Sequence, residues 1–414
     1  MNCFFTSVNN AYIPKALVWA ESVRKIYPDS TIYCILSDRR RDDIDYAGFD
    51  RILTPEELDI SVENIGGWIF SHTVVELCTA VKPFAFRKIF RETRASAVIY
   101  MDPDTVLYSP MDEVYEFLKH HPIVVTPHVS IPATREDDLL DGELLGCLRH
   151  GVFNLGYLAI ADYGEGLNFL DWWEARCLKY CYDDAARGLF TDQRWIDLAP
   201  CFFETLKILR LPTYNVATWN LYYREIGRDS SGRITVNGDH PLRFFHFSGF
   251  DIGTHELMLK RHAPSNSVLR EMTSWYVEKQ RQYGQLRFGK RGGAFDFFPN
   301  GDPIQREMRA CYRESSELMA RFPDPYGSLA FLLWWRQQHT GVRGGTERES
   351  MRHEAADCKV APSSSAYRHS SSARDLLAHL EEGGIRRRFL KAILTRALPR
   401  SLKEYIRQRR SRVA

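Results

Sequence analysis

Long hydrophobic runs are missing from this chain of 414 residues. No apolar stretch approaches the ~20 residues that a membrane-crossing helix requires, and the opening residues 1–5 lack the basic segment of a secretory signal. The nine cysteines lack the paired spacing of a zinc site, so we expect them to be reduced and mostly packed. Hydrophobic residues make up 44% of the chain, which suffices for a substantial core. These features predict a globular protein that stays in the cytoplasm.

The formal net charge of +2 hides an asymmetry along the chain. Residues 385–414 contain eleven Lys or Arg and one acid, which leaves 44 bases and 52 acids elsewhere. Apolar residues from Ile385 to Leu398 fall on one face of a predicted helix, which Pro399 ends. Such a helix either lies on an anionic surface, here the cytoplasmic face of the inner membrane, or docks on the body of the protein. Nucleic acid is not an expected partner, because the acidic body offers no continuing basic surface.

Strand and helix patterns alternate in the first part of the chain. Short apolar runs at 4–8 and 32–36 predict strands, and helical spacing over 13–27 predicts a helix between them. Residues 73–90 also read as one helix, whereas residues 130–151 are acidic and loop-like. We therefore expect an α/β protein. Its expected parts are a main domain over 1–262, a helical extension over 263–339, a flexible linker over 340–372 and a basic amphipathic tail over 373–414.

Two carboxylates follow a predicted buried strand at 97–101. Asp102 and Asp104 stand two residues apart around Pro103, so in extended backbone both point to the same side. Converging carboxylates repel each other unless a cation lies between them, and hard divalent ions such as Mg²⁺ or Mn²⁺ prefer such ligands. The alternative is an ordinary turn, since Asp and Pro are common turn residues.

Other polar residues have two interpretations each. Asn9, Asn10 and Tyr12 follow the first strand, where open α/β sheets bind ligands, but the asparagines can equally cap the next helix. Lys82 precedes a proline and can point into a cleft, or it can be solvated surface. His246 can be a ligand or a core histidine that bonds a neighbouring carbonyl.

The order of these motifs is more specific than any one of them. Over residues 3–260 the sequence resembles the retaining glycosyltransferases of family 8 type, which include bacterial lipopolysaccharide galactosyl- and glucosyltransferases. The matching segments are Asn9-Asn10-x-Tyr12-x-Pro14, Lys82-Pro83, Tyr100-Met101-Asp102-Pro103-Asp104, Phe153-Asn154-x-Gly156, Thr191-Asp192-Gln193 and His246-Phe247-Ser248-Gly249.

The resemblance implies a GT-A fold, which is a Rossmann-like mixed sheet flanked by helices, and a nucleotide-sugar donor such as a UDP-hexose. It implies that Asp102, Asp104 and His246 bind Mn²⁺ or Mg²⁺, and that Asp102 also belongs to the donor-binding residues. Thr6, Asn9, Asn10 and Tyr12 are implied to contact the nucleoside, and Lys82 the donor phosphate or sugar. Asn154 and Asp192 are implied to contact sugar hydroxyls, and Gln193 to lie near the anomeric carbon. The implied acceptor is a glycan or glycolipid, and the implied outcome is retention.

Two departures from the family pattern bear on the donor. Phe250 and Asp251 occupy the region where the family's histidine motif continues to a lysine, so phosphate binding is left to Lys260, Arg261 or a loop residue. Asp197 stands where the Asp-Gln motif usually ends in asparagine.

Two other functions remain open from the sequence. A sugar nucleotidyltransferase also places a metal-binding carboxylate after a parallel strand, but it needs a glycine-rich loop that residues 7–12 lack. A non-catalytic sugar-binding or scaffold protein of polysaccharide assembly is the second alternative. Loss of a metal ligand would favour it, and all three candidate ligands are present.

Overall fold

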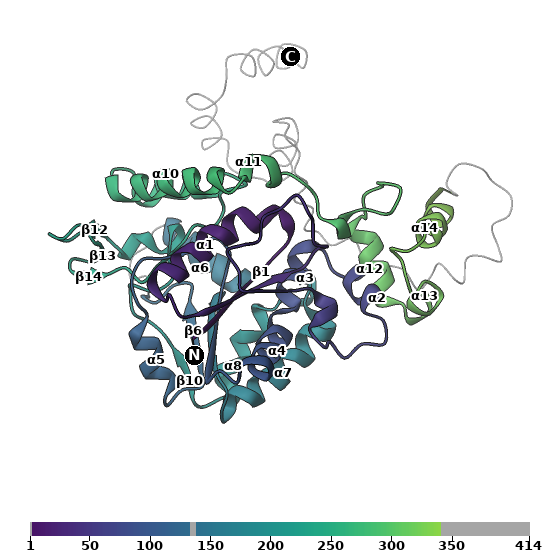
Figure 1. Cartoon of the computed structure of the whole chain (residues 1–414), viewed down its shortest axis with the longest axis horizontal. Coiled ribbons are helices and arrows are strands. Elements are labelled where there is room, and N and C mark those ends of the chain that lie inside the picture. The colour runs from purple at the N-terminus through teal and green to yellow at the C-terminus, as the bar shows by residue number, and fades with distance from the viewer. Residues whose placement is uncertain (1, 133–137, 341–414) are drawn as a thin grey trace, which may run out of the picture. The chain divides into compact units, whose positions relative to one another are not determined.

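A seven-stranded sheet forms the centre of the protein, with the strand order β10-β6-β7-β4-β1-β2-β3. The computed structural model describes residues 2–132 and 138–340 (Figure 1). The strands of this sheet are β1 (Cys3–Val8), β2 (Thr31–Leu36), β3 (Arg51–Leu53), β4 (Ala97–Met101), β6 (Ile123–Pro127), β7 (Phe153–Ala161) and β10 (Leu206–Ile208). β1 runs parallel to β2 and β4, while β7 is antiparallel to β4 and β6. The predicted mixed α/β sheet is therefore confirmed.

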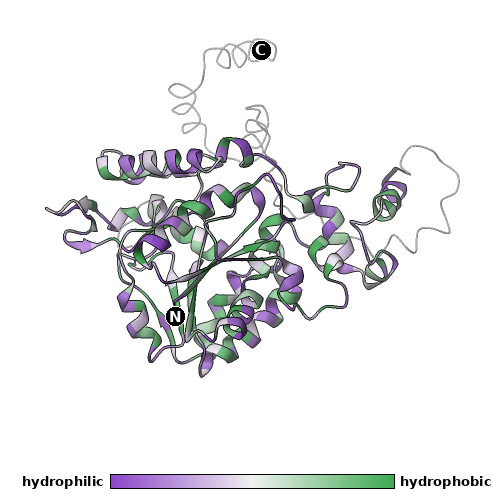
Figure 2. Cartoon of the chain, viewed as in Figure 1, coloured by the Kyte–Doolittle hydropathy of each residue, from purple (hydrophilic) through white to green (hydrophobic). Residues whose placement is uncertain are grey.

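Both faces of the sheet are covered because its strands are apolar at nearly every position. On one face, Phe5 and Tyr100 pack with α2 (Ile65–Phe70), α3 (Val74–Ala80), α4 (Lys82–Thr93) and α7 (Glu165–Tyr180). On the other face, Phe4 and Ile99 pack with α1 (Ile13–Ile26) and α5 (Asp112–Leu118). Figure 2 shows the hydrophobic residues along the central strands, whereas much of α10 (Ser267–Gln282) is hydrophilic.

Smaller sheets extend this core. One of them, in the order β11-β15-β5, contains β5 (Thr105–Leu107), β11 (Val216–Ala217) and β15 (Phe244–His246). The others combine β12 (Ile226–Arg228), β13 (Ile234–Val236) and β14 (His240–Pro241), and β8 (Asp183–Asp184) with β9 (Leu189–Phe190). The remaining α-helices are α6 (Asp138–His150), α8 (Ala199–Phe202), α9 (Thr254–His262), α11 (Gln285–Phe288), α12 (Arg306–Glu314), α13 (Ser316–Arg321) and α14 (Ala330–Thr340).

Two predicted elements differ in the structure. The region 130–151, predicted to be a loop, contains helix α6, whose leucines at 144 and 148 have helical spacing that the acidic composition masked. The single helix predicted over 73–90 is two helices, α3 and α4, that meet at Val81. Pro83 lies in the first turn of α4, where its missing N–H is tolerated, so a new helix begins there.

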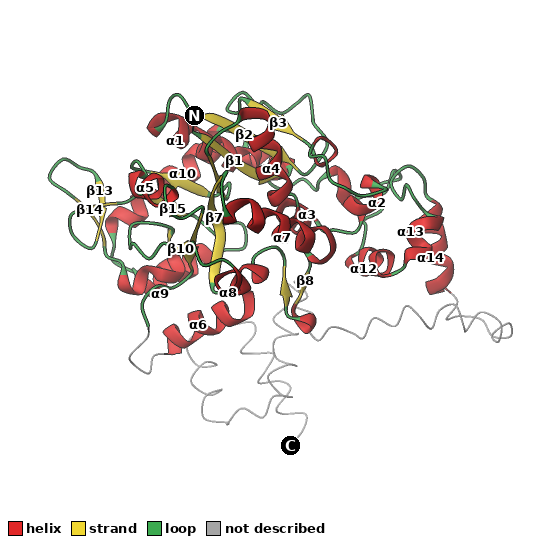
Figure 3. Ribbon diagram, turned by 90° about the horizontal axis from the view of Figure 1, so that it is seen from below, coloured by secondary structure: helices red, strands yellow, loops and turns green. Residues whose placement is uncertain are grey.

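The helices that follow residue 300 lie beside α2, away from α10 (Figures 1 and 3). Arg309 of α12 joins them to the core, because its guanidinium donates to the carbonyls of Phe70, His72 and Phe295. A helical extension was predicted here, and the domain boundaries themselves stay a prediction. The predicted linker and basic tail lie outside the described residues. None of the helices in the described ranges has the length and apolar composition needed to cross a membrane.

Candidate metal and sugar-transfer site

The Asp102-Pro103-Asp104 segment forms a tight turn between β4 and β5. The backbone N–H of Thr105 donates to the Asp102 carbonyl at 3.1 Å, and the Thr105 hydroxyl donates to the same oxygen at 2.7 Å. The Asp102 N–H in turn donates to the Gly156 carbonyl of β7 at 2.9 Å. The turn is thus fixed to the end of the central sheet, and both carboxylates are presented from a rigid backbone.

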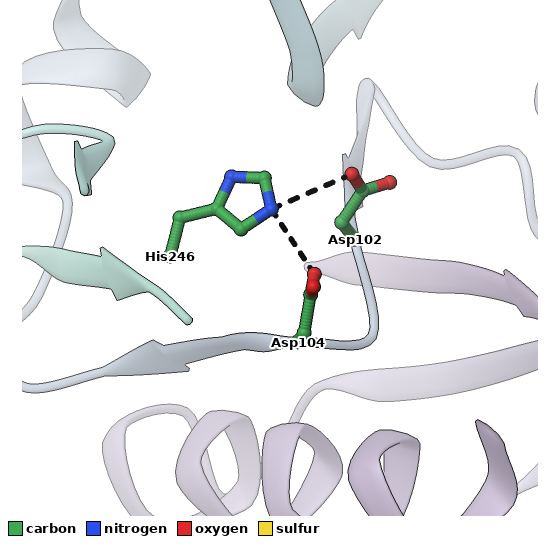
Figure 4. A group of neighbouring side chains, drawn as sticks. All are labelled: Asp102, Asp104 and His246. Carbon is green, nitrogen blue, oxygen red and sulfur yellow. Dashed lines mark ion pairs between the residues drawn. The ribbon is translucent and has the colours of Figure 1, made fainter. Parts of the chain in front are cut away.

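Strand pairing brings His246 to these carboxylates from 142 residues away in the sequence. β15 is antiparallel to β5 with His246 opposite Thr105, and the Phe247 N–H donates to the Asp104 carbonyl at 2.7 Å. In Figure 4, Nε2 of His246 points at both aspartates. It lies 3.0 Å from Oδ1 of Asp104 and 3.7 Å from Oδ2 of Asp102. One ligand atom from each of the three residues lies within 4.8 Å of the others.

Gly156 keeps the space between these side chains open. A Cβ atom at this position would lie 2.5 Å from Cε1 of His246, 2.7 Å from Oδ1 of Asn154 and 2.9 Å from Oδ2 of Asp102. Any larger residue would therefore have to displace a member of the cluster. The Phe153-Asn154-x-Gly156 segment therefore shapes the site in two ways. Gly156 leaves room for the neighbouring side chains, and Asn154 supplies a polar side chain.

The charges of these side chains shift the pKa values of His246 and Asp104. Burial alone would lower the pKa of His246, but the carboxylates of Asp104 and Asp102 outweigh it and raise that pKa above its usual range. Burial would likewise raise the pKa of Asp104, but His246, and then Lys15, hold it below the usual range. A pair of carboxylates with one imidazole nitrogen, arranged around a space that a Cβ would fill, fits a divalent ion.

Lys82 joins this cluster to Asp192. Its Nζ lies 3.0 Å from Oδ2 of Asp192 and 3.9 Å from Oδ1 of Asp102, and it donates to the Leu155 carbonyl at 3.2 Å. The side chain is buried and its Nζ lies over the Tyr100 ring. Burial alone would lower the pKa of Lys82, yet Asp192 and then Asp102 outweigh it and raise that pKa. The surface alternative for Lys82 is thus wrong, and the lysine is a buried counter-charge for two candidate site residues.

Gln193 connects two backbone segments beside this ion pair. Its Oε1 accepts from the Leu155 N–H at 2.9 Å, and its Nε2 donates to the His150 carbonyl at 3.0 Å. The preceding Thr191 has φ +46°, an uncommon conformation for a β-branched residue, and its hydroxyl donates to Asp192 at 3.1 Å. The Thr191-Asp192-Gln193 segment therefore combines an uncommon backbone conformation at Thr191 with side chains that are held by hydrogen bonds.

The residues predicted to contact the nucleoside differ in how many hydrogen bonds their side chains already make within the protein. Asn10 is used within the protein, since its Nδ2 donates to the Arg39 carbonyl at 2.8 Å and its Oδ1 accepts from Tyr46 at 2.7 Å. Asn9 precedes the short 3₁₀ helix after β1, but its side chain makes no capping hydrogen bond. Thr6 is buried, and its Oγ1 has no hydrogen-bond partner among the residues that the structure describes. Within the described ranges the Thr6 hydroxyl is thus unpaired but buried, and Asn10 already bonds within the protein; the nucleoside contacts of Thr6, Asn9 and Asn10 stay predictions.

A second buried lysine lies beside Tyr12. Lys15 is 2% exposed, its Nζ lies 2.5 Å from Oδ2 of Asp251 and 4.0 Å from the centre of the Tyr12 ring. The Tyr12 hydroxyl donates to the same Asp251 oxygen at 2.7 Å. Lys260 is 72% exposed and pairs with Glu256 on its own helix. Lys15, which the sequence interpretation did not consider, is therefore better placed near the Asp104 cluster than Lys260.

Comparisons with known proteins give distant likenesses. No family model matches the chain. Uncharacterized protein YfnF of Bacillus subtilis (strain 168) is 27% identical over 209 residues, which are 49% of this chain and 66% of that protein. Uncharacterized protein YfnD of the same organism is 23% identical over 257 residues, which are 61% of this chain and 79% of that protein.

Two solved structures have similar arrangements at 14% identity. The galactosyltransferase LgtC, in complex with donor and acceptor sugar analogues, has a TM-score of 0.36, with 68% of this chain and 96% of that chain covered. The glycosyltransferase GlyE of Streptococcus pneumoniae TIGR4 has a TM-score of 0.37, with 67% and 64% covered. At these values, function has to be argued from the side chains of the site.

The structure adds a layer of residues behind the site that the sequence did not reveal. Oδ1 of Asn215 lies 3.3 Å from Nδ1 of His246, the ring nitrogen that does not face the aspartates, and the rings of Trp219 and His246 have centres 5.2 Å apart. His128 accepts from Asn154 at 3.1 Å. These residues come from irregular segments between short strands, where neither periodicity nor a motif marks them.

Proposed function

We propose that this protein is a divalent-metal-dependent glycosyltransferase of GT-A type, which moves a sugar from a nucleotide-diphosphate sugar to a glycan or glycolipid acceptor. The expected donor is a UDP-hexose and the expected outcome is retention. The observation that carries the proposal is the convergence of Asp102, Asp104 and His246 beside the buried Lys82–Asp192 pair.

The metal would be held by the two carboxylates and the Nε2 atom of His246. When bound, Mn²⁺ or Mg²⁺ supplies positive charge for the diphosphate leaving group, the main electrostatic demand of sugar transfer. Asp102 and Asp104 are positioned for this by the Thr105-stabilised turn, so little reorganisation is required of them.

The residues on the sugar side favour a front-face path over a covalent intermediate. Asp192 is nearly fully buried and ion-paired with Lys82, so its carboxylate is fixed in place and can serve as a hydrogen-bond acceptor for the sugar. Gln193 is neutral and therefore a poor nucleophile. We propose that Asp192 and Asn154 bind sugar hydroxyls, that Gln193 borders the anomeric carbon, and that the leaving phosphate receives the acceptor's proton.

Lys15 is our candidate for the diphosphate contact that the sequence left to Lys260, Arg261 or a loop residue. Its buried ammonium, shared with Asp251, contributes to the low pKa of Asp104 and so acts electrostatically at the metal cluster. A cation at this place would offset the charge of the phosphates next to the metal.

The experiment is Mn²⁺-dependent hydrolysis across a panel of UDP-, GDP- and TDP-hexoses. We expect turnover with one or a few donors, and loss of at least 100-fold in kcat for Asp102→Asn and Asp104→Asn. Asp171→Asn, which alters a surface carboxylate paired with Arg87, is the matched control and should retain activity.

The alternatives predict different results in the same assay. A scaffold protein would bind metal and sugar nucleotide without turnover, and that outcome would sink the transferase proposal. A sugar nucleotidyltransferase would instead release pyrophosphate from a nucleoside triphosphate and a sugar phosphate. Asp192→Ala that keeps most of its activity would remove the role proposed for Asp192.

The basic segment at 385–414 supports a lipid-linked or membrane-associated acceptor by its composition. Deleting residues 385–414 should shift the protein from the membrane to the soluble fraction of cells. An unchanged distribution would remove this part of the proposal.

A further inference from the structure

Asn215 lies directly behind His246 and is almost completely buried. It precedes β11, which pairs in parallel with β15 so that Ala217 is opposite His246. Its Oδ1 lies 3.3 Å from Nδ1 of His246, on the ring edge opposite the aspartates. The imidazole is thus held between the candidate metal-binding carboxylates and one amide.

The hydrogen-bond network fixes which end of the Asn215 amide faces His246. The backbone N–H of Gly156 donates to Oδ1 of Asn154 at 3.1 Å, which identifies that atom as the acceptor oxygen. Because Asn215 meets this oxygen at 3.0 Å, it must present its Nδ2 there. Nδ2 also donates to the Thr126 hydroxyl at 3.0 Å, so both amide hydrogens are used. The oxygen of Asn215 is then the atom that faces His246.

The contact with His128 is compatible with this orientation of Asn154. Nδ2 of Asn154 lies 3.1 Å from Nε2 of His128, which accepts that bond when Nδ1 carries the ring hydrogen. Burial lowers the pKa of His128 to about 4, so its ring is neutral and can accept. The same chain of bonds follows the sheet, because Thr126 of β6 is paired with Asn154 of β7 at a β-bulge.

The backbone of Asn215 is held as firmly as its side chain. Its φ is +48°, in the left-handed region that Asn tolerates better than most residues. Its carbonyl accepts from Nη1 of the buried Arg224 at 2.9 Å and from Nδ2 of Asn220 at 3.0 Å. A residue held in this way positions its neighbours and is not a flexible polar contact.

We propose that Asn215 is a positioning residue for the metal site: its amide oxygen accepts the Nδ1–H of His246 and thereby leaves Nε2 directed at the metal position between Asp102 and Asp104. The proposal rests on the metal-dependent function proposed above. Partners that hold the second nitrogen of a metal-binding histidine fix its tautomer and ring orientation, and their loss typically weakens metal binding 10–100-fold.

The test is Mn²⁺ affinity of the full chain without any sugar nucleotide, measured from the electron paramagnetic resonance signal of free Mn²⁺. Asn215→Gly suits the left-handed backbone and removes only the side chain, so we expect Mn²⁺ to bind about 10–100-fold more weakly. Asn237→Gly is the matched control, because Asn237 has φ +50° but is exposed after β13. Its affinity should equal that of the wild type.

His246→Ala separates positioning from general structural damage. In that background Asn215→Gly should cause no further loss of Mn²⁺ affinity, because the ring that it orients is gone. A further loss would mean that Asn215 acts through the fold and would overturn the proposal. Wild-type Mn²⁺ affinity in folded Asn215→Gly would also overturn it.

Mn²⁺ binding by two further variants, Thr126→Val and His246→Ala, completes the test. If Asn215→Gly does not fold, Thr126→Val removes one acceptor of the Asn215 amide at nearly constant shape and should weaken Mn²⁺ binding by about threefold to tenfold. An unchanged affinity in that variant would overturn the proposal. If His246→Ala itself binds Mn²⁺ like the wild type, the proposed metal site fails, whereas absence of turnover with intact Mn²⁺ binding counts only against the transferase.

Discussion

Removing the charge of Lys82 should destabilise the protein far more than removing a surface lysine of the same helix. In Lys82→Met the Asp192 carboxylate, only 1% exposed, loses the ammonium that lies 3.0 Å away. An uncompensated buried charge of this kind costs about 3–5 kcal/mol. Lys88 of α4 forms a comparable pair with Asp59 at 3.1 Å, but both side chains reach solvent, so Lys88→Met should cost ~0–1 kcal/mol.

The assay is urea unfolding followed by tryptophan fluorescence, at pH 8 and at pH 5. The loss in Lys82→Met should be smaller at pH 5, because burial raises the pKa of Asp192 and, without Lys82, this carboxyl takes up a proton more readily. The double variant Lys82→Met with Asp192→Asn should recover most of the free energy of unfolding, since no charge is then left unpaired. Equal and small losses in Lys82→Met and Lys88→Met would refute the reasoning.

Three further predictions follow from the charged groups around the site. Lys15→Met should weaken the binding of UDP in the presence of Mn²⁺ by about tenfold. Asp251→Asn should strengthen this binding, because the Lys15 ammonium then loses its carboxylate partner. Calorimetry that shows no change in either variant would contradict the role of Lys15. Mn²⁺ affinity should rise with pH, because the pKa of His246 is raised and a proton therefore competes with the metal for this ring. The metal-free protein should lose stability over the same pH range. The raised pKa of His246 in the native state stabilises the fold below about pH 6.5, and this contribution disappears as the ring deprotonates. An unaltered pH dependence in His246→Ala would rule this out. Burial lowers the pKa of His72 and of His128 to about 4. Their contribution to the stability of the fold is therefore present above about pH 6.5 and is lost as the pH falls toward 4. Urea midpoints should decline over this pH range, and the decline should be shallower in His72→Phe.

The carboxylate pair was predictable because its geometry is local. The short spacing of Asp102 and Asp104 after an apolar run keeps both carboxylates at the end of one strand, although the segment between them is a turn and not the extended backbone that was expected. The structure confirms the strand as β4, with the turn directly after it. The partnership with His246 was reached through motif order alone, because β5–β15 pairing joins residues far apart in sequence and no periodicity encodes it.

The residues that the sequence missed act through tertiary contacts. Asn215 is one asparagine in a short irregular segment, and its function depends on Thr126, Asn154 and His246 arriving from three different strands. Lys15 sits within an amphipathic helix, where a lysine normally indicates the solvent face. Its contacts are tertiary or depend on the fold, since its Nζ lies over the Tyr12 ring and pairs with Asp251 from the loop after β15.

The arrangement of charges explains how so many carboxylates can converge in one buried site. Lys82 offsets Asp192, Lys15 offsets Asp251, and His246 faces Asp102 and Asp104, which raise its pKa. A proton on His246 would therefore offset part of the charge of the two carboxylates while no metal is bound. A divalent ion that displaces this proton adds one net positive charge to the site, and an incoming diphosphate then supplies negative charge beside Lys15. Metal and nucleotide sugar should consequently bind with positive coupling, because the positive charge that the ion adds favours the diphosphate.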